Sequence, residues 1–212
     1  MTVARCTGVI LAGGLATRYG GRPKGLEVVA GARIIDRVAG ALRQAADELL
    51  LVANDPAASA WLPGVRVAAD ALPGHGGLGG IHAALVHART PVLVVAWDMP
   101  FVSTGLLAAM RQLGESGYDA AVPESGSKRG VEPLCAWYAP ACIAPIERRL
   151  AAGDRRVIGF YDDVRVAHLA AADVWRWGDP AIMFMNVNSP DELQLAERHA
   201  TTTAGEHHRP EA

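Results

Sequence analysis

Short, largely apolar runs alternate with helical patterns through the first hundred residues of the chain. Four of these runs have the length of a strand and cover residues 7–12, 48–54, 65–70 and 91–98. Apolar residues recur at helical spacing between them, over 33–45 and 80–88. Continuous apolar strands that alternate with helices are typical of a parallel sheet covered on both faces. The sequence therefore predicts an α/β fold.

Beyond Phe101 the alternation is less regular. We expect helices over 104–113 and 142–153 and strands over 118–123 and 132–139. Ser189 followed by Pro190 predicts the start of a last helix, since Ser is a favoured N-cap and Pro a favoured first helical residue.

The chain of 212 residues shows no internal linker and ends in the polar, aperiodic stretch "TTTAGEHHRPEA". We expect residues 1–200 to form a single domain and residues 201–212 to be a disordered tail. His207 and His208 lie in that tail and are expected to be solvated, not metal ligands.

Composition argues against a nucleic-acid-binding protein, a disulfide-bonded protein and a membrane protein. The formal net charge of −2 gives no general attraction to nucleic acid or to an anionic membrane, so neither is expected as a partner. The three cysteines form no C-x-x-C pair and are predicted to be buried thiols in a reducing compartment. The start of the chain resembles neither a signal peptide nor an anchor, and "VLVVAW" is too short to cross a bilayer. We expect a soluble, cytoplasmic protein.

Polar groups follow each of the four predicted strands. They are Gly13-Gly14, Asn54-Asp55, Asp70 and Asp98. Ligands of open parallel sheets bind at the carboxyl ends of the strands, so these groups are expected to meet in one crevice.

Asp98 leaves the most apolar strand directly into a turn that contains Pro100. Taken alone, it is more simply a capping or turn acid. At the edge of a sheet it could also supply a carboxylate to Mg²⁺, which takes one or two carboxylates together with substrate phosphates.

The stretch "LAGGLATRYGGRPKG", residues 11–25, offers glycines to an anion together with the cations Arg18 and Lys24. It is not a Walker A loop, because Lys24 follows Pro23 and precedes Gly25. Either it is a mobile glycine-rich loop or it binds phosphate. Its place directly after the first strand favours phosphate binding.

The stretch "GHGGLG", residues 74–79, fits the dinucleotide pattern G-x-G-x-x-G, but it does not follow a strand directly. We expect a flexible loop over the ligand, with Gly79 and Gly80 opening the next helix. His75 and His82 are expected to be structural.

Several motifs together resemble the molybdenum cofactor guanylyltransferases, the MobA family of nucleotidyltransferases. Residues 11–25 are similar to the signature L-A-G-G-x(3)-R-x-G-x(3)-K of the superfamily. Blocks similar to those of the narrower family follow in the same order: "GGLGGIHAAL", "WDMPFVS", "EPLCAWY", "GDRRVIGF" and "NVNSPDEL". The resemblance covers residues 7 to about 196. It implies a three-layer α/β/α Rossmann-like nucleotidyltransferase fold with a mostly parallel central sheet.

The resemblance implies transfer of GMP from GTP to the molybdopterin-bound molybdenum cofactor, with Mg²⁺ as the metal and pyrophosphate as the second product. GTP and the molybdopterin cofactor would be the substrates, and a molybdenum insertase, apo-molybdoenzymes and their chaperones become candidate partners. Arg18, Lys24 and Asp98 would be catalytic, with Asp98 on Mg²⁺.

The same resemblance assigns the binding residues. Backbone groups of Leu11, Ala12, Gly13 and the neighbouring Gly14 would hold the nucleotide, with Asp70 and Gly79. The asparagine that the family places beside guanine falls at Val52, whereas this chain has Asn54 two residues on. Arg156, Asn186 and Asn188 would contact the pterin.

Three alternatives stay open. One is a sister enzyme that transfers CMP to the same pterin, or a nucleotidyltransferase acting on a sugar phosphate. Another is a non-catalytic chaperone that binds GTP or the cofactor and hands it on. The third is a different α/β enzyme that uses the glycine loop for another phosphate compound.

Overall fold

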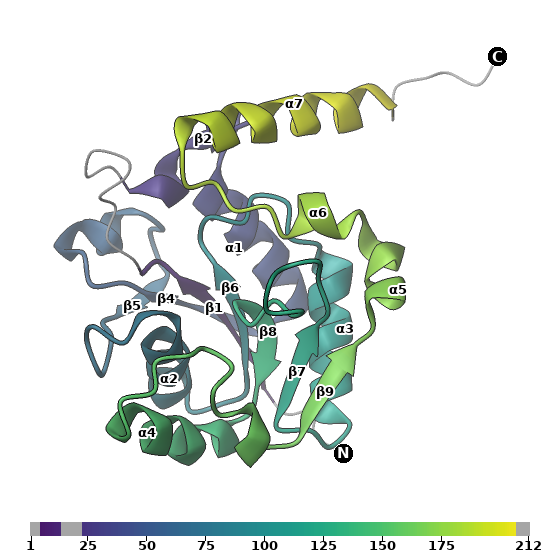
Figure 1. Ribbon diagram of the computed structural model, residues 1–212. Helices are drawn as coiled ribbons and strands as arrows, with labels where there is room; N and C mark the ends of the chain where they lie inside the picture. The colour runs from purple at the N-terminus through teal and green to yellow at the C-terminus, as the bar shows by residue number, and fades with distance from the viewer. Residues whose placement is uncertain (1–4, 14–22, 207–212) are drawn as a thin grey trace.

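A seven-stranded sheet crosses the middle of the computed structural model, which describes residues 5–13 and 23–206 and side chains up to Thr201 (Figure 1). From one edge to the other the strands are β5 (Arg66–Ala68), β4 (Glu48–Val52), β1 (Thr7–Leu11), β6 (Val92–Ala96), β8 (Cys135–Tyr138), β7 (Ala120–Pro123) and β9 (Val166–Leu169). The strands expected from the sequence are all present.

The sheet is mostly parallel, as predicted. Strands β5, β4, β1 and β6 run parallel in one block, and β8 runs antiparallel between β6 and β7. In the parallel block, Leu11 is paired with Val52 on one side and with Ala96 on the other. The strands of this block therefore end at the same edge.

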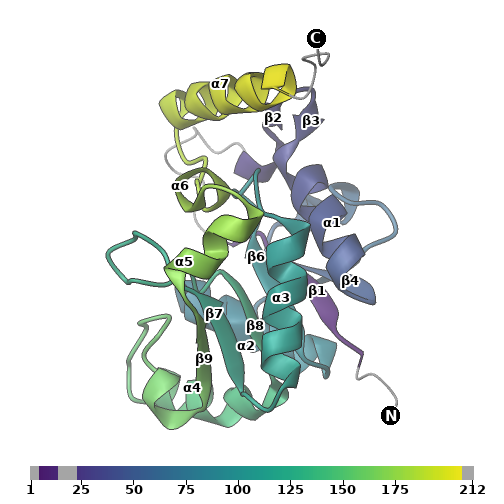
Figure 2. The same cartoon turned by 90° about the vertical axis from the view of Figure 1, so that its right-hand side faces the viewer.

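Helices cover both faces of the sheet (Figures 1 and 2). On one face lie α1 (Ile34–Ala45) and α3 (Thr104–Glu115), and on the other lie α2 (Gly76–Ala88) and α4 (Ile143–Ala151). Successive side chains of a strand point to opposite faces. Accordingly, Ile10 packs with α1 and α3, whereas Val9 packs with α2 and α4. The predicted α/β fold with helices on both faces is confirmed.

Burial follows the predicted helical pattern. In α1 the expected apolar stripe is fully buried, and α2 buries nearly its whole length. The cysteines Cys6, Cys135 and Cys142 are buried free thiols, as expected, and burial raises the pKa of each to about 12.

The C-terminal segment ends against the hairpin that precedes α1. After β9 it forms α5 (Ala171–Val174) and α6 (Pro180–Met183), and then α7 (Pro190–Glu206) lies over the hairpin of β2 (Val28–Val29) and β3 (Ala32–Arg33) (Figures 1 and 2). Short 3₁₀ turns complete the fold: η2 (Lys24–Leu26), η3 (Pro56–Ala60), η4 (Pro140–Cys142), η5 (Tyr161–Asp163) and η6 (Trp175–Trp177).

Two predicted boundaries are wrong. Helix α7 begins at Pro190 as expected but continues to Glu206, so residues 201–206 are helical and do not belong to a disordered tail. Helix α2 begins at Gly76, not at Gly79 or Gly80. A Cβ on Gly77 would contact the side chains of Val157 and Leu134, so glycine suits this close approach in the first turn. None of the helices in the described part of the chain is long and apolar enough to span a membrane.

Candidate functional site

A cavity of about 730 Å³ opens at the carboxyl ends of β1, β4, β5 and β6. This volume lies within the usual range of small-molecule sites. The cavity is lined by Leu11, Ala12, Gly13, Pro23, Val52, Asn54, Asp55, Trp61, Asp70, Gly74, Gly76, Gly77, Gly80, Ala96, Trp97, Asp98, Leu134 and Asn186. The crevice expected from the polar residues after the strands is therefore present.

The structure brings most of the predicted site residues together. Eight of them line the cavity: Leu11, Ala12, Gly13, Val52, Asn54, Asp70, Asp98 and Asn186. Lys24 joins this group through its ion pair with Asp98, and Asn188 joins it through its hydrogen bond with Lys24. Gly14 and Arg18 lie outside the described residues.

Asp98 follows β6, and its side chain is only 13% exposed. Its backbone oxygen accepts a hydrogen bond from the Val187 N–H at 2.9 Å. The carboxylate oxygen Oδ1 is buried without a hydrogen-bond partner among the described residues, and burial raises the pKa of this carboxyl group. A buried carboxylate oxygen without a partner is costly, whereas a hard divalent cation satisfies it directly. Asp98 therefore fits a divalent metal.

Lys24 supplies the positive charge nearest to this carboxylate within the described residues. Its Nζ lies 4.0 Å from Asp98 Oδ2 and donates a 2.5 Å hydrogen bond to Asn188 Oδ1. The neighbouring Gly25 packs directly on the ring of Trp97, and any Cβ there would overlap that ring. Glycine is thus required for the chain that carries Lys24 to approach the end of β6 this closely.

Asn54 and Asp70 join the ends of β4 and β5 by two reciprocal hydrogen bonds. Asn54 Nδ2 donates to Asp70 Oδ2, and the Asp70 N–H donates to Asn54 Oδ1, both at 2.8 Å. The side chain of Val52 is apolar and 2% exposed, so it offers no hydrogen bond to a base. The amide at this edge therefore comes from Asn54, which also orients Asp70.

Backbone groups at the end of β1 are partly used by the sheet. The Ala12 N–H donates to the Val52 oxygen at 2.9 Å, and the Leu11 oxygen accepts from the Trp97 N–H at 3.2 Å. Ala12 therefore has its carbonyl oxygen, and not its N–H, left for a ligand.

The N-terminus of α2 forms another wall of the cavity. Gly74 and Gly76 adopt positive φ angles of 86° and 59°, which glycine reaches at no steric cost. The first residues of a 13-residue helix have N–H groups without helical partners, and these groups suit a phosphate. The "GHGGLG" stretch thus contributes the start of a helix to the cavity, where a flexible loop was expected.

Two predicted ligand contacts lie elsewhere. Gly79 is outside the lining, and a Cβ on it would come within 2.9 Å of the Cβ of His75, so its visible role is close packing. Arg156 is also outside the lining; its side chain is 75% exposed and paired with Asp154 at 2.8 Å. His82 is buried against Glu147, as expected of a structural histidine.

An aromatic pair in the lining was not predicted. The rings of Trp61 and Trp97 are stacked with centroids 5.1 Å apart. The position of Trp97 beside Asp98 is a signal that could have indicated it. Trp61 follows the 3₁₀ turn η3 and carries no such signal.

Comparisons with known proteins show the family to which this chain belongs. Residues 8–166 match the family model described as the MobA-like NTP transferase domain. The chain belongs to this family. Its recognition from the motifs is therefore confirmed.

A relative in Pelotomaculum thermopropionicum, named "Probable molybdenum cofactor guanylyltransferase", is 40% identical over 91% of this chain and 92% of its own length. The crystal structure of molybdopterin-guanine dinucleotide biosynthesis protein A from Archaeoglobus fulgidus is similar with a TM-score of 0.78 and 28% identity, over 92% of this chain and 99% of that one. Rv0371c from Mycobacterium tuberculosis, solved in complex with manganese, shares the fold with a TM-score of 0.64 and 21% identity, over 93% and 100% of the two chains.

Proposed function

We propose that this chain transfers GMP from GTP to the molybdopterin-bound molybdenum cofactor and releases pyrophosphate. The family membership supports a nucleotidyltransferase, and the names of the relatives from Pelotomaculum and Archaeoglobus support guanylyl transfer to this pterin. The observation that carries the proposal is the buried carboxylate oxygen of Asp98, which has no partner among the described residues and lies beside Lys24 in a cavity at the ends of four strands.

Asp98 would hold a divalent cation, and Mg²⁺ is the cation that we propose. Bound there, Mg²⁺ would neutralise charge on the phosphate oxygens. The manganese in Rv0371c is a property of that protein, and it supports a divalent ion at a site of this fold.

The chain's own residues position the triphosphate. Lys24 would offset negative charge on the leaving pyrophosphate, together with Arg18, which lies outside the described residues. The N–H groups at the start of α2 would donate hydrogen bonds to phosphate oxygens. Asn54 and Asp70, with backbone groups of Leu11, Ala12, Gly13 and Gly14, would hold the nucleoside.

The reaction needs no protein nucleophile. An oxygen of the terminal phosphate of the pterin forms a bond to the α-phosphorus of GTP. The bond from that phosphorus to the bridging oxygen breaks, and pyrophosphate leaves with the electron pair. Positioning and charge neutralisation carry such a transfer.

The pterin would enter beside Asn186, which lines the cavity, and near Arg156 and Asn188.

We place the reaction in the cytoplasm, where GTP is available, and we propose residues 1–200 as one domain. A molybdenum insertase and apo-molybdoenzymes or their chaperones are the partners that would supply the substrate and take the product.

Mass spectrometry of the product tests the proposal. The protein is incubated with molybdenum-loaded pterin, Mg²⁺ and GTP, and in parallel with CTP, ATP or UTP. We expect the guanine dinucleotide and stoichiometric pyrophosphate from GTP. Product from CTP instead would assign the chain to cytidylyl transfer, and bound GTP without pyrophosphate release would make it a carrier.

A further inference from the structure

Lys24 lies between two partners at unequal distances. Its ammonium group is 2.5 Å from Asn188 Oδ1 and 4.0 Å from Asp98 Oδ2. Both Lys24 and Asp98 are largely buried, with side chains 15% and 13% exposed. The ammonium is thus hydrogen-bonded to a neutral amide although a carboxylate lies close by.

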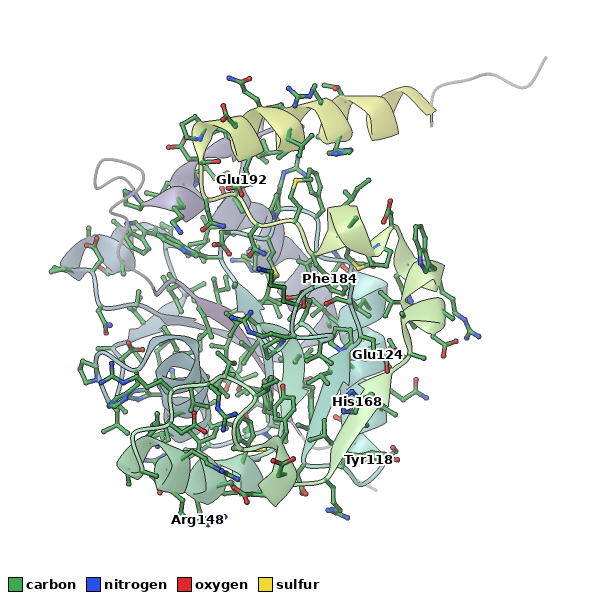
Figure 3. The ribbon with its side chains drawn as sticks, viewed as in Figure 1. Tyr118, Glu124, Arg148, His168, Phe184 and Glu192 are labelled. Atoms are coloured by element: carbon green, nitrogen blue, oxygen red, sulfur yellow. The ribbon has the colours of Figure 1, made fainter. Side chains whose placement is uncertain are left out.

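Asn188 is held in place by the first turn of α7. Its N–H donates to Glu192 Oε2 at 2.6 Å, and Ser189 Oγ donates to the same oxygen at 3.1 Å. The Glu192 N–H in turn donates to Ser189 Oγ at 3.3 Å, so the cap resembles a capping box in which the Glu side chain reaches the N–H of Asn188. Figure 3 shows Glu192 at the N-terminal end of α7, beside the chain that leads into the helix.

The same segment is attached to the end of β6. The Val187 N–H donates to the backbone oxygen of Asp98 at 2.9 Å. One short stretch therefore fixes the main chain of Asp98 and, through Asn188, the side chain of Lys24.

A lysine released at this position has an obvious alternative partner. In a partly buried setting, an ammonium and a carboxylate attract each other far more strongly than in water. Without Asn188, Lys24 would move the short distance to Asp98 and form a direct ion pair. That pair would occupy the carboxylate and bring a positive charge to the place where a cation has to bind.

We propose that Asn188 is a positioning residue that holds Lys24 beside Asp98 and so keeps the Asp98 carboxylate open to a divalent cation. This inference rests on the proposed function for the role of the metal. It differs from the role that the family resemblance gives Asn188, which is contact with the pterin.

Binding of Mn²⁺ to the protein without nucleotide or pterin tests this inference, with free Mn²⁺ measured by electron paramagnetic resonance. Asn188→Ala should weaken Mn²⁺ binding about tenfold, since a unit charge brought onto a carboxylate shifts its equilibria by about one logarithmic unit or more. Lys24→Met should bind Mn²⁺ at least as tightly as the wild type, because it removes the competing ammonium.

A variant that combines Lys24→Met with Asn188→Ala distinguishes a positioning role of Asn188 from a general loss of structure. In the Lys24→Met background, Asn188→Ala should change Mn²⁺ affinity by less than about twofold, because the two effects act through the same contact. A variant that had simply misfolded would not regain affinity in this way. Gln44→Ala is the matched control: it removes an exposed amide on α1, outside the cavity lining, so no change in Mn²⁺ affinity is expected.

The inference would be overturned if Asn188→Ala left the Mn²⁺ affinity unchanged. It would also be overturned if Asn188→Ala lowered the affinity equally in the wild type and in the Lys24→Met background. So would a wild-type protein that binds no Mn²⁺ in the absence of nucleotide. Because these measurements use neither substrate, they can fail while guanylyl transfer stands, and the product assay can fail while they succeed.

Discussion

The two halves of the sheet contribute very differently to the cavity. The parallel half, β5, β4, β1 and β6, supplies most of the lining, from Leu11 to Asp98. The half that contains β8, β7 and β9, with the chain after it, supplies only Leu134 and Asn186. Parallel strands end at one edge, whereas the reversed strand β8 carries its end away from it.

The difference extends to how the polar side chains are held. In the parallel half, Asn54 and Asp70 fix each other, and Lys24 is fixed beside Asp98. Arg156, in the second half, is exposed and bonded only to the nearby Asp154 among the contacts that the structure describes. Arg156, which is proposed for the pterin, is therefore not held against the rest of the cavity, whereas Asn54, Asp70 and Lys24 are already fixed in place. Substitutions in the first half should be the more damaging.

Asp98→Ala should have the largest effect. Loss of the proposed metal carboxylate removes charge stabilisation that is worth about 10³-fold or more in rate. The fold should survive, because Oδ1 makes no hydrogen bond within the described residues that the substitution would break. Steady-state pyrophosphate release and a thermal melt check this, with Asp36→Ala, on α1 and outside the cavity lining, as the control. A cooperative melt with unchanged activity would contradict the assignment.

Lys24→Ala should lower both the rate and the affinity for GTP. A charge-assisted hydrogen bond contributes about 1.5–3 kcal/mol, so kcat/KM should fall about 10- to 100-fold. Lys128→Ala, which removes an exposed lysine, is the matched control. Normal kinetics in Lys24→Ala would remove Lys24 from the proposed site.

Asn54→Ala should raise KM for GTP with little change in kcat, because it frees Asp70 but leaves the metal carboxylate intact. One lost hydrogen bond of about 1 kcal/mol corresponds to about a fivefold rise in KM. The comparison with Gln44→Ala, an exposed amide on α1, isolates the site effect. If only the KM for the pterin changed, Asn54 would act on the pterin and not on the nucleotide, against the proposal.

Arg156→Ala should have the smallest effect. An exposed cation contributes little, so the KM for the pterin should rise only about threefold while GTP affinity and thermal stability stay the same. Arg165→Ala removes an arginine of similar exposure, bonded to Asp119, and should leave both KM values unchanged. If Arg156→Ala weakened GTP binding instead, the contrast between the two sides of the cavity would fail.

Much of this architecture could be predicted from local patterns. Continuous apolar runs specify the buried strands, and the residue after each strand places Asn54, Asp70 and Asp98 at one edge. Ser189 and Pro190 correctly indicated the start of α7 because capping depends on neighbouring residues.

The features that could not be predicted depend on distant contacts. Lys24 meets Asn188 across 164 positions of sequence, and no local pattern encodes that pairing. The early start of α2 runs against the low helix propensity of its glycines, and the close approach of Gly77 to Leu134 and Val157 is a contact between distant parts of the chain. The pairing of Arg156 with Asp154 is local, but the exposure of that pair depends on the tertiary fold.

A crystal structure of the protein with GTP and Mg²⁺ tests the central claim most directly. The account predicts a triphosphate along the edge formed by Gly13, the start of α2 and Asp98, with the metal on the Asp98 carboxylate. Density for the nucleotide elsewhere, with this edge empty and Asp98 paired directly with Lys24, would contradict it.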